Sequence, residues 1–165
     1  MVKLALLSFW HVHAQDYARQ AKEHPDTEIV AVWDEDPDRG KAAAEKLETV
    51  YYEQLDEVLA LPEVEGVIVT TPTAAHRDVI IQAANAGKHI FTEKVLAATL
   101  KECNEIAAAV KENGVKLTVS LPRLNDQYTL AIQNLLEQGI LGNITLVRTR
   151  LSHHGATKGW LPEHF

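Results

Sequence analysis

The chain has 165 residues, 46% of them hydrophobic, so it is long enough for one ordinary domain with a buried core, and disorder is not expected. A formal net charge of −7 and a pI of about 5.6 exclude the clustered positive charge that nucleic-acid binding needs. No apolar run approaches the ~20 residues of a membrane span. A lone cysteine, Cys103, excludes an internal disulfide framework and suits a reducing compartment. We therefore expect a cytoplasmic protein that binds neither nucleic acid nor membranes.

Short β-branched runs alternate with longer helical patterns along most of the chain. This alternation is typical of βαβ units and of a parallel sheet covered by helices on both faces. It predicts an α/β fold, a doubly wound parallel sheet. The expected strands are 3–8, 28–33, 66–70, 88–92 and 116–120, and the expected helices between them are 11–23, 37–47, 54–60, 74–86 and 100–113.

Several of these helices carry end signals. Asp36 before Pro37 predicts an N-cap with proline at the first helical position, and Thr99 with Glu102 predicts a capping box. Glycines that follow a helical run, where a left-handed residue would end it, are Gly87, Gly114 and Gly139. The end signals agree with the periodic patterns.

A second, smaller part follows the last of these strands. A helix is expected over 126–138 and a strand with alternating faces over 144–151. We expect a dinucleotide-binding domain over 1–121, and over 122–165 a connecting helix and the first strand of an incomplete second α/β domain. Exposed aromatic residues near Phe165 suggest a truncated chain.

The turn after the first strand is the main candidate for a phosphate contact. A dinucleotide-binding fold places its glycine fingerprint there, yet the stretch 8–13 reads Ser-Phe-Trp-His-Val-His. Backbone amides and a helix N-terminus can still hold a pyrophosphate without glycine. The candidate cofactor contacts are therefore Ser8, Trp10, His11 and Val12. The alternative is a structural turn that binds no phosphate.

His11-Val12-His13 has a second possible meaning, because a His-x-His pair after a first strand can hold zinc in barrel hydrolases. Such a site needs further ligands at later strand ends. The remaining candidates are scattered through the chain without a ligand rhythm: His76, His89, His153 and His154. We expect no metal site, and exposed or packed histidines instead.

Asp34 ends the second expected strand, about 20 residues beyond the turn, where a carboxylate meets the adenosine ribose of a dinucleotide. A carboxylate there accepts both ribose hydroxyls of NAD and repels the 2′-phosphate of NADP. NAD is therefore the expected cofactor, with NADP less favoured. Alternatively, Asp34 is a solvated strand end and Asp36 only an N-cap.

Two later strand ends reach the same edge of the sheet. Thr71 and Pro72 follow one of them, with His76 in the next helix as a functional or a packed residue. Glu93 and Lys94 follow the other, and an ammonium group beside a nicotinamide ring could exchange a proton with a substrate hydroxyl. The alternative for this pair is a solvated ion pair of little consequence.

The order of these motifs resembles the Gfo/Idh/MocA oxidoreductases over nearly the whole chain. The segments that carry the resemblance are Thr71-Pro72 to His76, Ala86 to Ile90, Thr92-Glu93-Lys94 with Leu96-Ala97, Asp34 to Arg39, the stretch of Arg123 and Tyr128, and Leu136 to Ile144. Three departures stand out: no glycine in the first turn, Val95 in place of the proline of the Glu-Lys-Pro motif, and the stop at Phe165.

The resemblance implies an NAD(P)-dependent dehydrogenase or reductase that moves a hydride to or from a carbinol carbon of a sugar, cyclitol or related compound. By motif, Lys94 is implied as the catalytic lysine, with Glu93 and Arg123 near the nicotinamide and Asp34 at the ribose. Thr71 and Pro72 line the cofactor through their backbone. The full-length protein is expected to be a homo-oligomer, and this chain alone to be inactive. The rival is a non-catalytic Rossmann-type module that senses NAD or binds a protein.

Overall fold

The computed structural model describes residues 1–152, 154, 158 and 159. Its centre is a six-stranded parallel sheet in the order β3-β2-β1-β4-β5-β6, the strand order of a Rossmann fold, which confirms the predicted α/β class. The strands are β1 (Val2–Leu7), β2 (Thr27–Trp33), β3 (Val50–Tyr52), β4 (Gly66–Val69), β5 (His89–Thr92) and β6 (Leu117–Val119). The helices are α1 (Ala14–Glu23), α2 (Pro37–Leu47), α3 (Leu55–Leu59), α4 (Thr73–Asn85), α5 (Leu100–Glu112), the 3-10 helix η1 (Pro122–Asn125) and α6 (Gln127–Glu137).

The chain divides between Ser120 and Leu121 into two compact units. The first, residues 1–120, contains the sheet and α1 to α5. The second contains η1 and α6, and neither helix has a buried residue. Among the described residues, no helix is long and apolar enough to cross a membrane.

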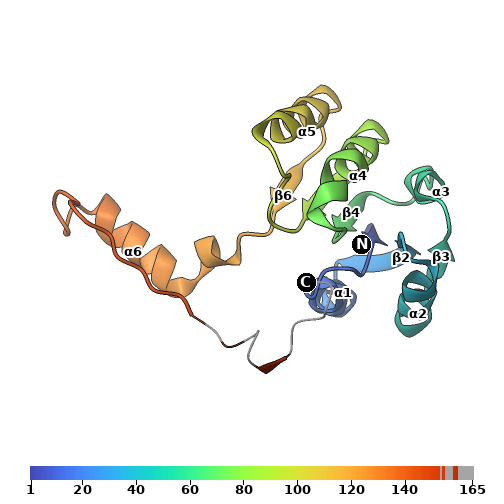
Figure 1. Ribbon diagram of the computed structural model, residues 1–165, viewed down its shortest axis with the longest axis horizontal. Helices are drawn as coiled ribbons and strands as arrows, with labels where there is room; N and C mark the ends of the chain where they lie inside the picture. The colour runs from blue at the N-terminus through green and yellow to red at the C-terminus, as the bar shows by residue number, and fades with distance from the viewer. Residues whose placement is uncertain (153, 155–157, 160–165) are drawn as a thin grey trace. The chain divides into compact units, whose positions relative to one another are not determined.

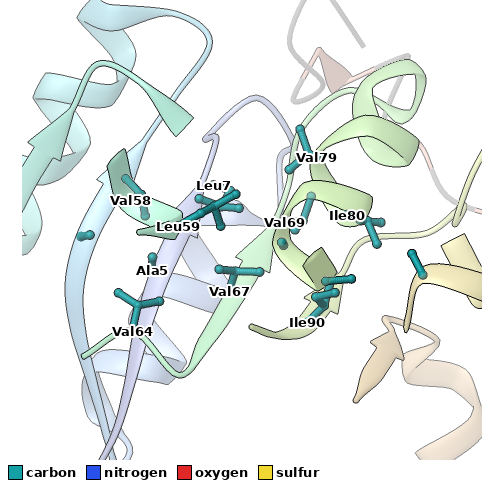
Figure 2. Close-up of a cluster of buried hydrophobic side chains, with 14 of the residues drawn as sticks. Ala5, Leu7, Val58, Leu59, Val64, Val67, Val69, Val79, Ile80 and Ile90 are labelled. Carbon is teal, nitrogen blue, oxygen red and sulfur yellow. The ribbon is translucent and has the colours of Figure 1, made fainter. Parts of the chain in front are cut away.

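Helices cover both faces of the sheet, as Figure 1 shows, with α1 and α2 on one side and α3 to α5 on the other. On the α3–α5 side, β1 and β4 contribute Leu7 and Val67 to a core that α4 closes with Ile80 (Figure 2). On the other side, Leu6 packs against small residues of α1 such as Ala18. Successive strand residues therefore face different helices, which explains why β4 is buried along its whole length.

The predicted helix ends are confirmed. Asp36 accepts hydrogen bonds from the amides of Asp38 and Arg39, and Thr99 and Glu102 form the full capping box. The three glycines expected to end helices all have positive φ, at 73° for Gly87, 65° for Gly114 and 69° for Gly139. Local signals were sufficient here because caps depend only on neighbouring residues.

Three details of the predicted elements are wrong. The first helix starts at Ala14 instead of residue 11, because 11–13 form a turn. The edge strand β3 was not expected, since three residues give too short a pattern. Residues 144–151 form no strand, although their faces alternate, because a strand needs a hydrogen-bonded neighbour and none pairs with them within the described part of the chain.

Candidate functional site

The carboxyl ends of β1 and β4 lie side by side at the centre of the sheet. The connection from β1 leads to α1 on one face, and the connection from β4 leads to α4 on the other. This is the point where a doubly wound sheet opens a crevice for a ligand. The predicted site residues of the first unit follow β1, β2, β4 and β5 at this edge.

The turn after β1 keeps its shape without glycine. Ser8 has a φ of 77°, a left-handed conformation that glycine usually supplies. Its hydroxyl accepts the Trp10 amide at 3.1 Å, and its carbonyl accepts the Thr70 hydroxyl at 2.6 Å. The Phe9 and His11 amides bond to other loops, at Asp34 Oδ2 (2.7 Å) and the Thr70 carbonyl (3.2 Å). Three amides that a glycine turn would offer to phosphate are therefore engaged within the protein.

Asp34 lies at the end of β2 with its side chain fully buried. The Arg39 guanidinium donates to both of its oxygens, at 2.9 Å from Nε and 2.6 Å from Nη2. The Asp36 amide donates to Oδ1 at 2.9 Å. As folded, Asp34 is occupied by protein donors, so it is not the solvated strand end that sequence reasoning left open.

Arg39, which sequence reasoning did not select for the site, is the cationic partner of the carboxylates at this end of the edge. It also contacts Glu35 at 2.8 Å and Asp36 at 3.9 Å. Burial would lower the pKa of Arg39, but the bonds and charge of Asp34 raise it above its ordinary value. The guanidinium is thus held by three carboxylates.

Gly40 lets α2 approach this ion pair closely. A Cβ atom on Gly40 would lie 2.5 Å from Tyr51 Cε2 and 2.8 Å from Asp34 Cβ. Both distances are too short for a side chain, so only glycine fits without a shift. Gly40 therefore allows α2 to pack closely beside the end of β2. A fingerprint glycine allows the same close packing of helix on strand after β1.

Glu93, directly after β5, is the second buried carboxylate, with 1% of its side chain exposed. Its Oε1 lies 2.5 Å from His13 Nδ1 and accepts the Tyr17 hydroxyl, which is itself 2.7 Å from Ser120 Oγ. Its Oε2 accepts the Lys94 amide at 2.8 Å. Desolvation would raise the pKa of Glu93, yet the bonds from Tyr17, His13 and Lys94 lower it below its ordinary value. Glu93 is therefore stabilised as the anion.

His11 completes the surroundings of Glu93. Its Nδ1 lies 3.6 Å from Glu93 Oε1 and accepts the His13 amide at 3.2 Å. Burial lowers the pKa of His11 to about 4, more than the opposing charge of Glu93 raises it. His11 is therefore a neutral imidazole near pH 7.

His76 ties the loop after β4 to the loop after β5. It is buried, with Nδ1 at 2.9 Å from the Val95 carbonyl and Nε2 at 3.0 Å from the Thr71 carbonyl. The Thr71 hydroxyl is buried and has no hydrogen-bond partner within the part of the chain that the structure describes. The peptide bond between Lys94 and Val95 is cis. The Thr71 carbonyl is thus engaged by His76, whereas its buried hydroxyl has no partner in the described chain.

The structure brings most of the predicted site residues to one edge of the first unit. The residues after β1 are Ser8, Trp10, His11 and Val12, and the residue after β2 is Asp34. The residues after β4 are Thr71, Pro72 and His76, and those after β5 are Glu93 and Lys94. Arg123 lies in the second unit, where it donates to the Tyr128 hydroxyl at 2.9 Å. Tyr17 and Ser120 were missed. The signal for Tyr17 was its position four residues after His13, on the same face of α1.

A hollow of about 450 Å³ lies elsewhere, on the α1 side of the sheet. Its lining includes the first residues of four strands, Val2, Thr27, Gly66 and His89. It therefore opens at the amino half of the strands and away from the carboxyl edge. It is apolar and contains none of the carboxylates described above.

Comparison with known proteins agrees with this arrangement. Residues 10–121 match the model of the Gfo/Idh/MocA oxidoreductase family with its NAD-binding Rossmann fold. An uncharacterized oxidoreductase of Streptococcus pneumoniae is 32% identical over 160 residues, which cover 97% of this chain and 41% of that protein. Inositol 2-dehydrogenase of Salmonella typhimurium is 29% identical over 166 residues, covering 99% of this chain and 48% of its own length.

Among solved structures, the WlbA dehydrogenase of Bordetella pertussis, crystallised with NADH and UDP-GlcNAcA, superimposes with a TM-score of 0.81 at 24% identity. The match covers 87% of this chain and 41% of that one, and at this identity it supports the fold alone. The chain spans less than half the length of the relatives it matches. The family model matches 112 residues of the chain, and the sheet has the Rossmann strand order. The chain therefore belongs to the Gfo/Idh/MocA oxidoreductases and includes their NAD(P)-binding Rossmann domain.

Proposed function

We propose that this chain is the nucleotide-binding part of an oxidoreductase that transfers a hydride to or from a carbinol carbon of a sugar, cyclitol or related compound. The observation that carries the proposal is the convergence of the turn after β1, Thr71 and the Glu93-Lys94 pair at the switch point of a family Rossmann sheet. The named relatives support the substrate class, since one acts on inositol. We expect the whole protein to be a cytoplasmic homo-oligomer.

The residues at this edge fit NAD better than NADP, although not for the reason that the sequence indicated. Asp34 is occupied, but Glu35 and Asp36 next to it are 36% and 53% exposed. Arg39 is already held by these carboxylates, so no spare guanidinium charge is left for a 2′-phosphate. The negative corner therefore favours a ribose diol over a phosphate.

Lys94 is the residue we assign to the proton. Its side chain is exposed at the edge, while its amide is fixed by Glu93 Oε2 at 2.8 Å. When bound, the nicotinamide ring gives or accepts the hydride. Lys94 would then hold or accept the proton of the substrate hydroxyl, Glu93 would keep the loop in place, and Thr71 would offer its hydroxyl to the cofactor.

A specific observation supports the rival, a Rossmann module without turnover. The amides of Phe9, Trp10 and His11 are already bonded within the protein, and Ser8, Trp10 and His13 carry side chains where glycines are expected. Pyrophosphate would have to rely on the start of α1. Weak or absent binding of the dinucleotide would favour this rival.

Parallel calorimetric titrations with NAD and NADP test the proposal. We expect saturable binding with preference for NAD, and Glu35→Lys should narrow that preference by placing a cation at the acidic corner. Thr71→Val removes only the buried hydroxyl and should weaken the affinity for NAD by roughly fivefold, which corresponds to about one hydrogen bond. Thr118→Val, on the exposed face of β6, is the matched control and should bind NAD like the wild type. Absence of binding in the folded wild type would contradict the proposal.

A further inference from the structure

The side chains of His11, His13 and Glu93 form one cluster at the carboxyl edge. Each offers a donor atom, and these atoms lie within 4.8 Å of one another. Glu93 and His11 are fixed in the interior, with 1% and 5% of their side chains exposed, while His13 is 50% exposed. Two imidazoles and one carboxylate are the donor set of open zinc sites and of 2-His-1-carboxylate iron sites.

No lysine or arginine side chain in the described part of the chain pairs with Glu93. Among the described residues, its ion-pair partners are only the two imidazoles, at 2.5 Å and 3.6 Å, and its other contacts are the Tyr17 hydroxyl and the Lys94 amide. Asp34, the other buried carboxylate of this edge, is paired with Arg39. A buried carboxylate without a lysine or arginine partner is a place where a metal cation would be stabilised strongly.

The groups around Glu93 also resemble the outer shell of a metal site. Ser120 bonds to the Tyr17 hydroxyl at 2.7 Å, and Tyr17 in turn bonds to Glu93. The Tyr17 ring packs edge-on against Phe91 of β5, with centroids 5.1 Å apart. Partners of this kind fix the orientation of ligating carboxylates and tune their affinity.

We propose that His11, His13 and Glu93 bind one divalent transition-metal ion, with Zn²⁺ as the first candidate, in a site with three protein ligands. The ion would replace the 2.5 Å contact of His13 with Glu93, since ligands of a tetrahedral ion lie about 3.4 Å apart. The His13 side chain can make this adjustment because it is half exposed and caps α1 without a side-chain bond to the helix.

Three protein ligands leave one coordination position of a tetrahedral ion open. Because His13 and Lys94 are both exposed at this edge, the natural occupant of that position is water or the hydroxyl or carbonyl oxygen of a small polar molecule. The sequence did not predict the site because the third ligand is a glutamate 80 residues from His13. The site does not depend on NAD binding, and the two can be tested separately.

The test uses the 165-residue chain without a histidine tag, because its eight histidines already offer adventitious sites. After chelator treatment and dialysis, Zn²⁺ is titrated by calorimetry and Co²⁺ is followed by its visible absorption. We expect one equivalent to bind, and His13→Gln and Glu93→Gln each to weaken binding by at least about tenfold and to abolish the cobalt band. His24→Gln, an exposed histidine at the end of α1, is the matched control and should bind like the wild type.

Circular dichroism checks that each variant is folded. If Glu93→Gln does not fold, His13→Gln alone tests the metal site. It is expected to fold because the His13 side chain is half exposed. A wild type without saturable binding overturns the proposal. So does equal weakening in His24→Gln, or a folded His13→Gln or Glu93→Gln that binds as tightly as the wild type.

Discussion

Two carboxylates are buried at the same edge of the sheet, and they are held in opposite ways. Asp34 is paired with a guanidinium that comes from its own neighbouring helix, five residues away. Glu93 is held by one imidazole and one phenol from a distant part of the chain: His13, the residue before α1, and Tyr17 in α1, which lie 80 and 76 residues away. The charge of Asp34 is compensated by the guanidinium of Arg39, whereas no arginine or lysine in the described chain compensates the charge of Glu93.

The difference separates a structural role from a ligand-binding one. A buried carboxylate with a bidentate arginine has no remaining need for a ligand, and loss of either partner exposes an unpaired charge. A buried carboxylate without an arginine or lysine partner should lose less stability when its charge is removed, and it can attract a cation. Stability and ligand binding are therefore expected to respond differently at the two ends.

The largest effect is expected from removing the partner of Asp34. Arg39→Leu should destabilise the fold by about 3 kcal/mol, because it leaves a buried anion with only the Phe9 and Asp36 amides. Urea unfolding followed by circular dichroism measures the loss. Arg77→Leu removes ion pairs that are 42% exposed on the arginine side and screened by solvent, so it should cost far less than Arg39→Leu. Equal losses in the two variants would contradict this view of Asp34.

The carboxylates themselves can be compared by neutral replacements of the same shape. Asp34→Asn should cost about 2–3 kcal/mol, since it leaves the Arg39 guanidinium partly buried without its main anion. Glu93→Gln should cost only about 1 kcal/mol, because no lysine or arginine side chain loses its partner. Both are measured by unfolding in chelator-containing buffer. A larger loss of stability in Glu93→Gln than in Asp34→Asn would contradict the structural role given to Asp34 and the ligand-binding role given to Glu93.

Gly40→Ala tests how tightly α2 closes the Asp34 end. The added methyl group would meet Tyr51 at 2.5 Å and Asp34 at 2.8 Å, so we expect a loss of about 2 kcal/mol despite the better helix propensity of alanine. Combination with Tyr51→Ala removes the nearer contact and should recover part of the loss in a double-mutant cycle. Thermal unfolding of the four proteins gives the coupling. A stabilised Gly40→Ala would show that the approach of α2 is loose.

The smallest effect is expected from the helix cap beside the same ion pair. Asp36→Ala removes the bonds to the Asp38 and Arg39 amides and should cost about 1 kcal/mol in denaturant unfolding. Gln54→Ala, at the start of α3, is the control because its side chain makes no cap bond. That control should change stability by less than about 0.5 kcal/mol.

Much of the fold was predictable because its signals are local. The runs that became β1, β2, β4, β5 and β6 are rich in aliphatic or β-branched residues, and the caps at Asp36 and Thr99 need only their own neighbours. Val50–Tyr52 is a strand because β2 lies beside it, and 144–151 is not one because no strand pairs with it in the described chain. Pairing of this kind is a tertiary property that periodicity does not contain.

The site was predictable as a location but not as a set of contacts. Asp34, Thr71 and Lys94 were expected at one edge because parallel strands end together. The sequence did not show that Arg39 would occupy Asp34, or that His13 and Tyr17 would meet Glu93, because each contact depends on how helices pack on the sheet. The glutamate after β5 and the His-x-His after β1 were visible, and only the strand order brings them together.

Ser8 carries a last consequence. With φ at 77° it adopts the backbone that a fingerprint glycine would supply, and its hydroxyl bonds to the Trp10 amide two residues later. In this turn, a side-chain hydrogen bond stabilises a backbone conformation that glycine adopts without strain. A search for Rossmann domains by their glycine spacing alone would therefore pass over a chain of this kind, although its sheet has the Rossmann strand order.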